Sequence, residues 1–432
     1  MSINQVVILA GGAGSRMSTV TRGPKSLMEI QGLSVLEWQI KFFYQRGVTN
    51  FFFLLGHFAK EIEIKLKLLE RIYPIVIDIE VENQPRGTAG ALLSSLSQLK
   101  DYFFLIHGDI LVNTELRKLE NAIVSENFDF ALTYHPTNHP DDSDLLIVDN
   151  HSKVSKIITK PHSLFRGRAL GNAGLYAAKK ESLLELSENY LVNPIKQDLD
   201  RELIPHLLEI GKTIAAVRNV GLVKDVGTPE RFAKVENEFS RLQQISFRRP
   251  AVFLDRDGTI NKLKGFIKTP DQIELMENVG DVISTLNKIG FWIIVITNQP
   301  VISRGEVTMQ GLEEIHGHIE RLLMFYGAII DDFFYCPHHP DSGFKDELKE
   351  LKILCDCRKP EDGLIKQALS IYPINLEESW VVGDSWRDIE LANRVGLKSI
   401  FLGEDDNSIN SDYKASSLIS VLEIIKRNIC EV

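Results

Sequence analysis

The chain of 432 residues contains one sequence pattern twice, an apolar run of strand length followed at once by a loop rich in glycine and charge. Residues 6–10 lead into the glycine loop at 11–14, and residues 251–254 lead into the loop D-R-D-G at 255–258. Helical and strand patterns alternate after both loops. Because strand–helix–strand order produces parallel strands covered by helices on both faces, we expect two tandem, doubly wound α/β/α units of three layers each.

The alternation of helices and strands is interrupted near the middle of the chain. A polar helical pattern covers 231–244, the segment S-F-R-R-P at 246–250 breaks it, and a new strand pattern begins at 251. We therefore expect a first domain over 1–245 and a second over 250–432, each long enough to bury its own core.

Local signals place several helices and strands. Ser34 and Glu37 form a capping box at the start of a helix with one apolar face, which we expect to stop at Gly47. The first half should also contain strands at 51–55 and 102–106. The expected elements of the second half are helices at 279–289, 309–325 and 387–395, and strands at 291–297, 380–383 and 399–402.

The charge balance limits the partners of this chain. Lys and Arg number 49 against 59 Asp and Glu, a net charge of −10, whereas nucleic-acid and anionic-membrane binders carry a broad basic surface. No apolar run approaches the length of a membrane span, and the N-terminal run lacks the basic flank of a signal peptide. We expect a cytoplasmic protein that acts on small molecules and binds phosphate through local cations, backbone amides or a divalent metal.

The first glycine loop has the residue types of a phosphate site. Gly11, Gly12 and Gly14 let the backbone approach a phosphate and offer amide donors. Arg16 adds a bidentate donor, and Lys25, after Pro24, adds a point charge. The alternatives are an ordinary tight turn and a dinucleotide fold, but the latter requires a third glycine where this chain has Met17.

Further candidates follow along the first half. The small-residue loop 82–90, which contains Gly87 and Thr88, suits one wall of a base or sugar site. Asp109 and Asp225 stand at strand ends, where carboxylates suit a Mg²⁺ that keeps several waters and bridges phosphates. Either aspartate taken alone could equally be a solvated turn residue.

In this order and spacing the motifs of residues 3–240 resemble the sugar-1-phosphate nucleotidyltransferase family, with its G-G-x-G-T-R-L, P-K, G-D, N-x-G and D-x-G-T-P motifs. The resemblance implies a mixed Rossmann-like sheet and attack of a sugar 1-phosphate on the α-phosphorus of an NTP, with release of pyrophosphate. It assigns Arg16 to pyrophosphate and Lys25 to the α-phosphate. It places Lys160 on the sugar phosphate, Asn172 in the binding site, and Asp109 and Asp225 on Mg²⁺. Thr159 stands where the family usually has a sugar-binding glutamate.

The second charged loop has the residues of a phosphoryl-transfer site. Of two aspartates separated by one residue, Asp255 can attack phosphorus while Asp257 protonates the leaving oxygen and then deprotonates water. Mg²⁺ between such carboxylates relieves their repulsion. Thr297, Asn298 and Gln299 end the next strand with short donors for phosphate oxygens. The remaining candidates are the cations Arg358 and Lys359 and the further metal ligands Asp384 and Asp388.

This ordered set over 250–430 resembles the haloacid-dehalogenase (HAD) superfamily of phosphatases, which implies a parallel sheet. By that resemblance Asp255 is the nucleophile and Asp257 the general acid/base. Thr297 and Lys359 stabilise the transferred phosphoryl group, Asn298 contacts it, and Asp255, Asp384 and the backbone carbonyl of Asp257 bind Mg²⁺.

Three of the four cysteines lie close together in the second half. Cys336, His338, Cys355 and Cys357 offer four soft ligands at zinc-site spacing, which predicts a tetrahedral and therefore structural Zn²⁺. His339 could replace His338 as a ligand, and free thiols are the alternative. Cys430 is expected to be an ordinary thiol.

The zinc loop and the runs L-D-R-D-G-T-I-N and C-R-K-P resemble the heptose-1,7-bisphosphate phosphatase subgroup, with the histidinol-phosphatase domain as the main rival. The resemblance implies that Arg304 contacts the distal phosphate and that Arg358 also binds substrate. Pro300 and Ser385 stand where the subgroup usually has serine and lysine.

The two halves together predict consecutive steps. A phosphatase that leaves a sugar 1-phosphate supplies the substrate of a nucleotidyltransferase, and the guanylyl form of the family favours GTP and a GDP-heptose for surface polysaccharide. One alternative is a transferase for another hexose 1-phosphate, fused to a histidinol-phosphate-type phosphatase. Another is a nucleotide-sugar sensor that regulates the phosphatase. The net charge of −10 argues against a third, a phosphatase for nucleic-acid ends.

Overall fold

The computed structural model describes residues 2–12, 23–149, 152–161, 165–244, 248–404 and 409–430. The chain forms two compact units. The first comprises Met1–His135, Asp142–Pro161 and Gly171–Ile245. The second comprises Ser246–Val432 together with Pro136–Asp141 and, among the described residues, 165–170.

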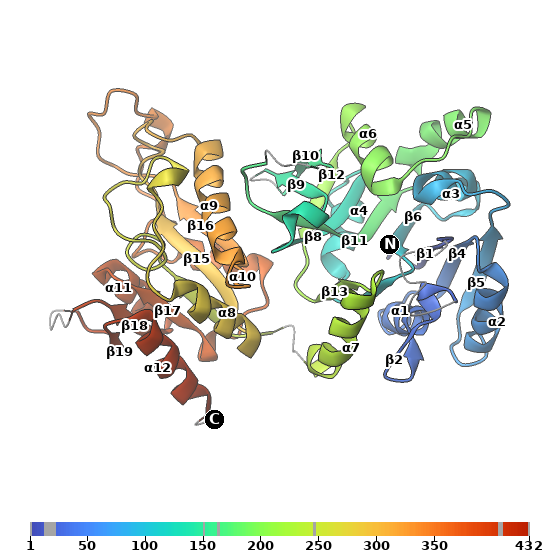
Figure 1. Ribbon diagram of the computed structural model, residues 1–432. Coiled ribbons are helices and arrows are strands. Elements are labelled where there is room, and N and C mark those ends of the chain that lie inside the picture. The colour runs from blue at the N-terminus through green and yellow to red at the C-terminus, as the bar shows by residue number, and fades with distance from the viewer. Residues whose placement is uncertain are drawn as a thin grey trace. The chain divides into compact units, whose positions relative to one another are not determined.

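The first unit is built on a mixed sheet in which four parallel strands form one side (Figure 1). In sheet order these strands are β6 (Tyr102–His107), β1 (Gln5–Ala10), β4 (Asn50–Leu55) and β5 (Val76–Val81). Beyond β6 the sheet continues with β11 (Leu170–Lys179), β9 (Leu145–Val148) and β10 (Val154–Ile158), and each of these strands runs antiparallel to the one before it. The remaining strands are β8 (Phe130–Pro136), which pairs with β11 and β12 (Ile214–Arg218); β7 (Ile110–Asn113) with β13 (Leu222–Asp225); and β2 (Glu29–Ile30) with β3 (Leu33–Ser34).

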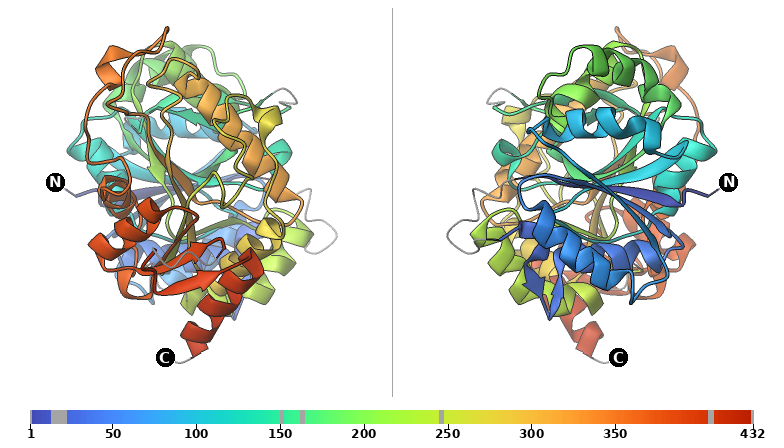
Figure 2. Two further views of the ribbon diagram at one scale, coloured as in Figure 1. Left: turned by 90° about the vertical axis from the view of Figure 1, so that its left-hand side faces the viewer. Right: turned by 90° about the vertical axis from the view of Figure 1, so that its right-hand side faces the viewer.

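Helices cover both faces of this sheet, as the right-hand view of Figure 2 shows for the blue and light-blue helices. They are α1 (Val35–Tyr44), α2 (Ala59–Leu69), α3 (Gly87–Ser95), α4 (Arg117–Val124), α5 (Leu184–Val192), α6 (Ile204–Glu209) and α7 (Pro229–Gln244). The predicted N-cap of α1 is present, since the Ser34 hydroxyl accepts a hydrogen bond from Glu37 N at 3.2 Å. The core joins β1 to α1 through Val6, Ile8 and Ile40.

The second unit has a six-stranded sheet in which every neighbouring pair is parallel. Its order is β16 (Asp332–Cys336), β15 (Trp292–Asn298), β14 (Ala251–Leu254), β17 (Trp380–Gly383), β18 (Lys398–Leu402) and β19 (Tyr413–Ala415). Its helices are α8 (Val279–Ile289), α9 (Met309–Met324), α10 (Gly363–Ile371), α11 (Trp386–Val395) and α12 (Leu418–Cys430). The predicted fold class, an α/β pair with one mixed and one parallel sheet, is confirmed.

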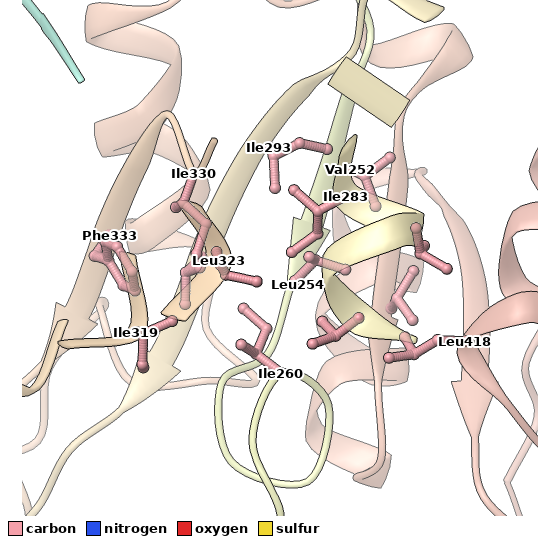
Figure 3. Packing of buried hydrophobic residues seen from close by; sticks show 14 of the residues in the cluster. Val252, Leu254, Ile260, Ile283, Ile293, Ile319, Leu323, Ile330, Phe333 and Leu418 are labelled. Carbon is pink, nitrogen blue, oxygen red and sulfur yellow. The ribbon is translucent and has the colours of Figure 1, made fainter. Parts of the chain in front are cut away.

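The core of the second unit lies between its sheet and helices (Figure 3). Val252 and Leu254 on β14 belong to one buried cluster with Ile283 on α8 and Ile319 on α9. Helical spacing of apolar residues buries one face of α8, and Gly290 ends the helix with φ of 112°. None of the helices in the described part of the chain has both the length and the apolar character that a membrane crossing requires.

Two candidate active sites

The first unit contains a cavity of about 670 Å³ at the carboxyl ends of β1, β4 and β6. Several residues that the sequence predicts for nucleotide or metal binding line this cavity. They are Gly11, Gly12, Lys25, Gly87, Thr88 and Asp109. The predicted Gly14 and Arg16 lie outside the described residues. The carboxyl ends of parallel strands are where α/β sheets bind ligands.

Asp109, Asp225 and Lys25 converge on one point beside Gly227. Lys25 Nζ lies 3.7 Å from Asp109 Oδ2 and donates a hydrogen bond to the Gly227 carbonyl at 3.0 Å. A Cβ atom at position 227 would lie 2.6 Å from Asp225 Oδ1 and 3.0 Å from Asp109 Oδ2, so both carboxylates approach the backbone of Gly227 closely. Two carboxylates beside one ammonium are an oxygen-rich donor set that fits a Mg²⁺ bridging phosphates.

Arg231 and Asp142, to which sequence reasoning gave no catalytic or binding role, also belong to this cluster. Arg231, in the first turns of α7, pairs with both Asp225 and Asp142. Lys160 donates a hydrogen bond to the Asp142 carbonyl at 2.7 Å. Lys160 therefore lies beside Asp142 and, through Arg231, is linked to Asp225. No local pattern marks Asp142, which is 89 positions from Arg231.

A partly buried polar network surrounds His107, which lines the cavity. His107 Nε2 lies 3.2 Å from Asp200 Oδ2, and the same carboxylate accepts hydrogen bonds from the Tyr176 hydroxyl and, at 2.8 Å, from Asn172 Nδ2. Burial by itself lowers the pKa of His107, but the hydrogen bond and charge of Asp200, with the charges of Asp109 and Asp198, raise it to about 9. Asn172 was predicted; Asp200 and Tyr176 were not, because only strand pairing and packing bring them to β6.

Replacing Asp200 with asparagine is expected to lower the pKa of His107 well below 9, because burial remains while the largest opposing charge is lost and only those of Asp109 and Asp198 are left. The raised pKa stabilises the folded protein fully below about pH 6.5, and this contribution, up to about 3 kcal/mol, is lost as the pH rises through 9. The unfolding free energy of the variant should lack that pH dependence. NMR titration of labelled histidines measures the pKa directly, with exposed Asp78→Asn as control. An unchanged His107 pKa in the variant would refute this assignment.

In the second unit a buried lysine joins the predicted nucleophile to a second carboxylate. Lys359 Nζ donates to Asp255 Oδ1 at 2.7 Å, to Asp388 Oδ1 at 2.6 Å and to the Ile296 carbonyl at 2.8 Å. Asp384 belongs to the same group, since ligand oxygens of Asp255, Asp384 and Asp388 lie within 4.8 Å of one another. Burial raises the pKa of Asp255 and Asp388, and burial with the charge of Asp255 raises that of Asp384 to about 6. Crowded carboxylates of this kind fit a divalent cation.

The side chain of Asp257 lies outside that carboxylate group and is held by three donors. Arg256, fully buried, contacts both carboxylate oxygens, with Nη2 2.7 Å from Oδ2. Asn261 Nδ2 donates to Oδ1 at 3.0 Å and Gln299 Nε2 to Oδ2 at 2.9 Å. Burial opposes ionisation, but Arg256 and these hydrogen bonds lower the pKa of Asp257. Sequence reasoning gave Arg256 and Asn261 no role, and it expected Gln299 to donate to a phosphate, whereas here Gln299 donates to Asp257.

The remaining predicted residues lie around this centre. Thr297 Oγ1 accepts a hydrogen bond from Gln299 Nε2 at 2.9 Å. Asn298 makes two hydrogen bonds to the Lys359 backbone, at 3.0 and 3.1 Å, which fixes the lysine relative to the end of β15. Gly258, with φ of 91°, leaves the space that the Asp384 carboxylate fills, and any side chain there would overlap it.

The four predicted zinc ligands come together in the second unit. Ligand atoms of Cys336, His338, Cys355 and Cys357 lie within 4.8 Å of one another, with Cys336 Sγ 3.5 Å from Cys355 Sγ and His338 Nδ1 3.2 Å from Cys357 Sγ. Burial lowers the pKa of His338, which keeps it neutral and able to ligate. His339 instead accepts a hydrogen bond from Asp341 N at 3.1 Å. Three sulfurs and one imidazole nitrogen fit a tetrahedral Zn²⁺.

Comparison with known proteins identifies two families in one chain. A family model described as nucleotidyl transferase matches residues 5–241, and one described as HAD-hydrolase-like matches residues 356–415. The D-glycero-beta-D-manno-heptose-1,7-bisphosphate 7-phosphatase of Escherichia coli K12 is 34% identical over 186 residues, which cover 41% of this chain and 94% of that protein.

Two solved structures match one unit each. The crystal structure of HddC from Yersinia pseudotuberculosis covers 55% of this chain and all of its own, at 22% identity and a TM-score of 0.46. That of D,D-heptose 1,7-bisphosphate phosphatase from B. bronchiseptica, complexed with magnesium and phosphate, covers 41% of this chain and 99% of its own, at 27% identity and a TM-score of 0.36.

Proposed function

Because the chain belongs to the nucleotidyl transferase family through its first half and to the HAD-like phosphatases through its second, we propose that it carries out two consecutive steps in making a nucleotide-activated heptose. The phosphatase removes the 7-phosphate of heptose 1,7-bisphosphate, and the transferase joins the resulting heptose 1-phosphate to a nucleotide. The observation that carries this proposal is the 34% identity to a heptose bisphosphate phosphatase over 94% of its length.

For the phosphatase step we propose the roles that the resemblance assigns to Asp255 and Asp257. Asp255 attacks phosphorus while Asp257 protonates the leaving oxygen, for which Asp257 must first take up a proton because Arg256 lowers its pKa in the free protein. Asp257 then takes a proton from the water that hydrolyses the aspartyl phosphate. Lys359, held by Asp255 and Asp388, neutralises charge on the phosphoryl group. Asp255, Asp384 and the Asp257 carbonyl would hold Mg²⁺, which stabilises developing charge.

The transfer step depends mainly on positioning and charge neutralisation. Lys25 neutralises the α-phosphate, Arg16 the departing pyrophosphate and Lys160 the sugar phosphate. Asp109 and Asp225 would hold Mg²⁺, and their approach to Lys25 beside Gly227 supports this assignment. At Gly12 no atom of the described residues lies within 4 Å of an added Cβ, which supports a phosphate beside that part of the loop.

We propose GTP as the nucleotide. Guanine presents its N2 amino group and neighbouring N1–H as donors, and the Glu82 carboxylate, which lines the cavity, can accept them. The screen that tests the whole proposal measures phosphate release from heptose 1,7-bisphosphate and from histidinol phosphate, then pyrophosphate release from GTP, ATP, CTP and UTP with heptose 1-phosphate. Preference for histidinol phosphate would overturn the phosphatase assignment, and absence of pyrophosphate with every NTP would favour the sensor alternative.

Removal of zinc is expected to destabilise the second unit alone. Cys357→Ser should lose the bound metal and lower the melting temperature of that unit by at least about 5 °C, since about 2–4 °C corresponds to each kcal/mol for a domain of this size. Metal analysis and calorimetry measure both effects, with Cys430→Ser as the matched control. Equal loss of stability in the first unit, or full zinc content in Cys357→Ser, would contradict a structural zinc at this site.

A further inference from the structure

Arg304 lies in the turn after β15 and is held by two aromatic rings. Its guanidinium carbon is 4.2 Å from the centroid of the Phe266 ring and 4.5 Å from that of Phe344. Its Nε is buried, and no residue in the described part of the chain accepts a hydrogen bond from it. Cation–π contact with each ring therefore restrains a guanidinium whose Nε no hydrogen bond fixes.

The two rings come from different loops of the second unit. Phe266 belongs to the segment between the D-R-D-G loop and α8, and Phe344 belongs to the loop between the zinc ligands His338 and Cys355. The zinc loop is attached to the Arg304 turn, because Leu348 N donates to the Ser303 carbonyl at 3.0 Å. Gly305, with φ of 71°, packs so closely on the Asp346 carbonyl that a side chain there would overlap it.

Other cations gather around the same place. Lys352 Nζ lies 4.6 Å from the centroid of the Phe344 ring, and Arg358 Nη1 donates to the His338 carbonyl at 3.2 Å. Lys352 is itself paired with Glu347 at 3.7 Å, so Arg304, together with Arg358 directly before Lys359 in the chain, provides charge for a second anion on a substrate whose first phosphate is at Asp255.

We propose that Phe266 and Phe344 are positioning residues that hold Arg304 for the second phosphate of a sugar bisphosphate and so set the preference of the phosphatase for doubly phosphorylated substrates. This inference rests on the proposed phosphatase function. A free arginine side chain would lose rotamer freedom when it binds phosphate, whereas one already restrained by two rings loses less. The rings therefore affect binding of the distal phosphate and leave the chemistry at Asp255 unchanged.

The test compares substrates with and without a second phosphate in the full-length protein. Phe344→Leu and Phe266→Leu should each raise the KM for heptose 1,7-bisphosphate and for fructose 1,6-bisphosphate about tenfold, equivalent to about 1.4 kcal/mol, with kcat unchanged. Hydrolysis of p-nitrophenyl phosphate should stay within about twofold of wild type. Phe344→Tyr, which keeps the ring, should restore the KM. The control is Phe325→Leu on a side chain that is 88% exposed.

A double substitution separates positioning from general damage. In an Arg304→Met background Phe344→Leu should have no further effect on KM, because the cation that it positions is gone. Equal losses on p-nitrophenyl phosphate and on both bisphosphates, or no KM change on either bisphosphate, would overturn the inference. If heptose 1,7-bisphosphate is not a substrate but fructose 1,6-bisphosphate shows the Phe344 dependence, the proposed heptose function fails while this inference stands.

Discussion

Asp255→Asn is expected to reduce phosphate release by at least about 10⁴-fold and to leave pyrophosphate formation at the wild-type rate. The carboxylate supplies the attacking electron pair, and an amide of the same shape cannot. Asp255 is also one of the three carboxylates that fit Mg²⁺, so the substitution weakens the metal site as well. Phosphate release from heptose 1,7-bisphosphate and pyrophosphate release from GTP, measured on the same preparation, give both rates.

The matched control for this substitution is Asp281→Asn, which changes an exposed aspartate on α8 of the same unit. It should retain both activities. A melting temperature close to wild type shows that Asp255→Asn is folded, which is expected because Lys359 keeps its contacts with Asp388 and the Ile296 carbonyl. If the folded variant releases phosphate at a rate within tenfold of wild type, Asp255 is not the nucleophile.

Asp109→Ala is expected to have the opposite selectivity, with pyrophosphate formation reduced more than about 100-fold and phosphate release unchanged. Loss of outer partners of metal ligands already costs 10–100-fold, so loss of a direct ligand should cost more. The substitution also removes the anion beside Lys25, whose Nζ lies 3.7 Å away. Raising the Mg²⁺ concentration should recover part of the rate, because the remaining carboxylate, Asp225, still faces the same point.

Asp101→Ala, at an exposed position just before β6, is the control for a lost aspartate near the same strand. It should keep both activities. A folded Asp109→Ala protein with normal pyrophosphate formation would remove Asp109 from the metal site. Loss of phosphate release together with pyrophosphate formation, in either aspartate variant, would contradict two separate sites.

Much of the fold follows from local pattern. The predicted bounds of α8, β14 and β17 coincide with the observed ones, and β15 begins one residue later than predicted. These elements are long apolar runs or amphipathic helices ended by glycine or charge, so propensity and packing agree. The antiparallel strands of the first sheet, β9 to β11, were less evident, since strand direction depends on which strands pair and not on the composition of each.

The residues at the ends of parallel strands could be predicted as a group for a simple reason. Parallel strands end at one edge of the sheet, so Asp255 after β14, Thr297 in β15 and Asp384 after β17 must meet there. The four candidate zinc ligands could also be predicted from the sequence, because cysteine and histidine at this spacing are typical of a zinc site. In both cases chemistry and spacing along the chain sufficed.

The sequence by itself thus determined the two fold classes and the candidate residues proposed for both sites, because each depends on residues near one another in the chain or on strand ends. Only the tertiary structure decided which side chains orient them: Asp200 against His107, Asp142 against Arg231, Gln299 against Asp257 and the two rings against Arg304. Those pairs depend on strand register and loop packing, where a shift of one residue turns a side chain to the other face. No local pattern encodes that choice.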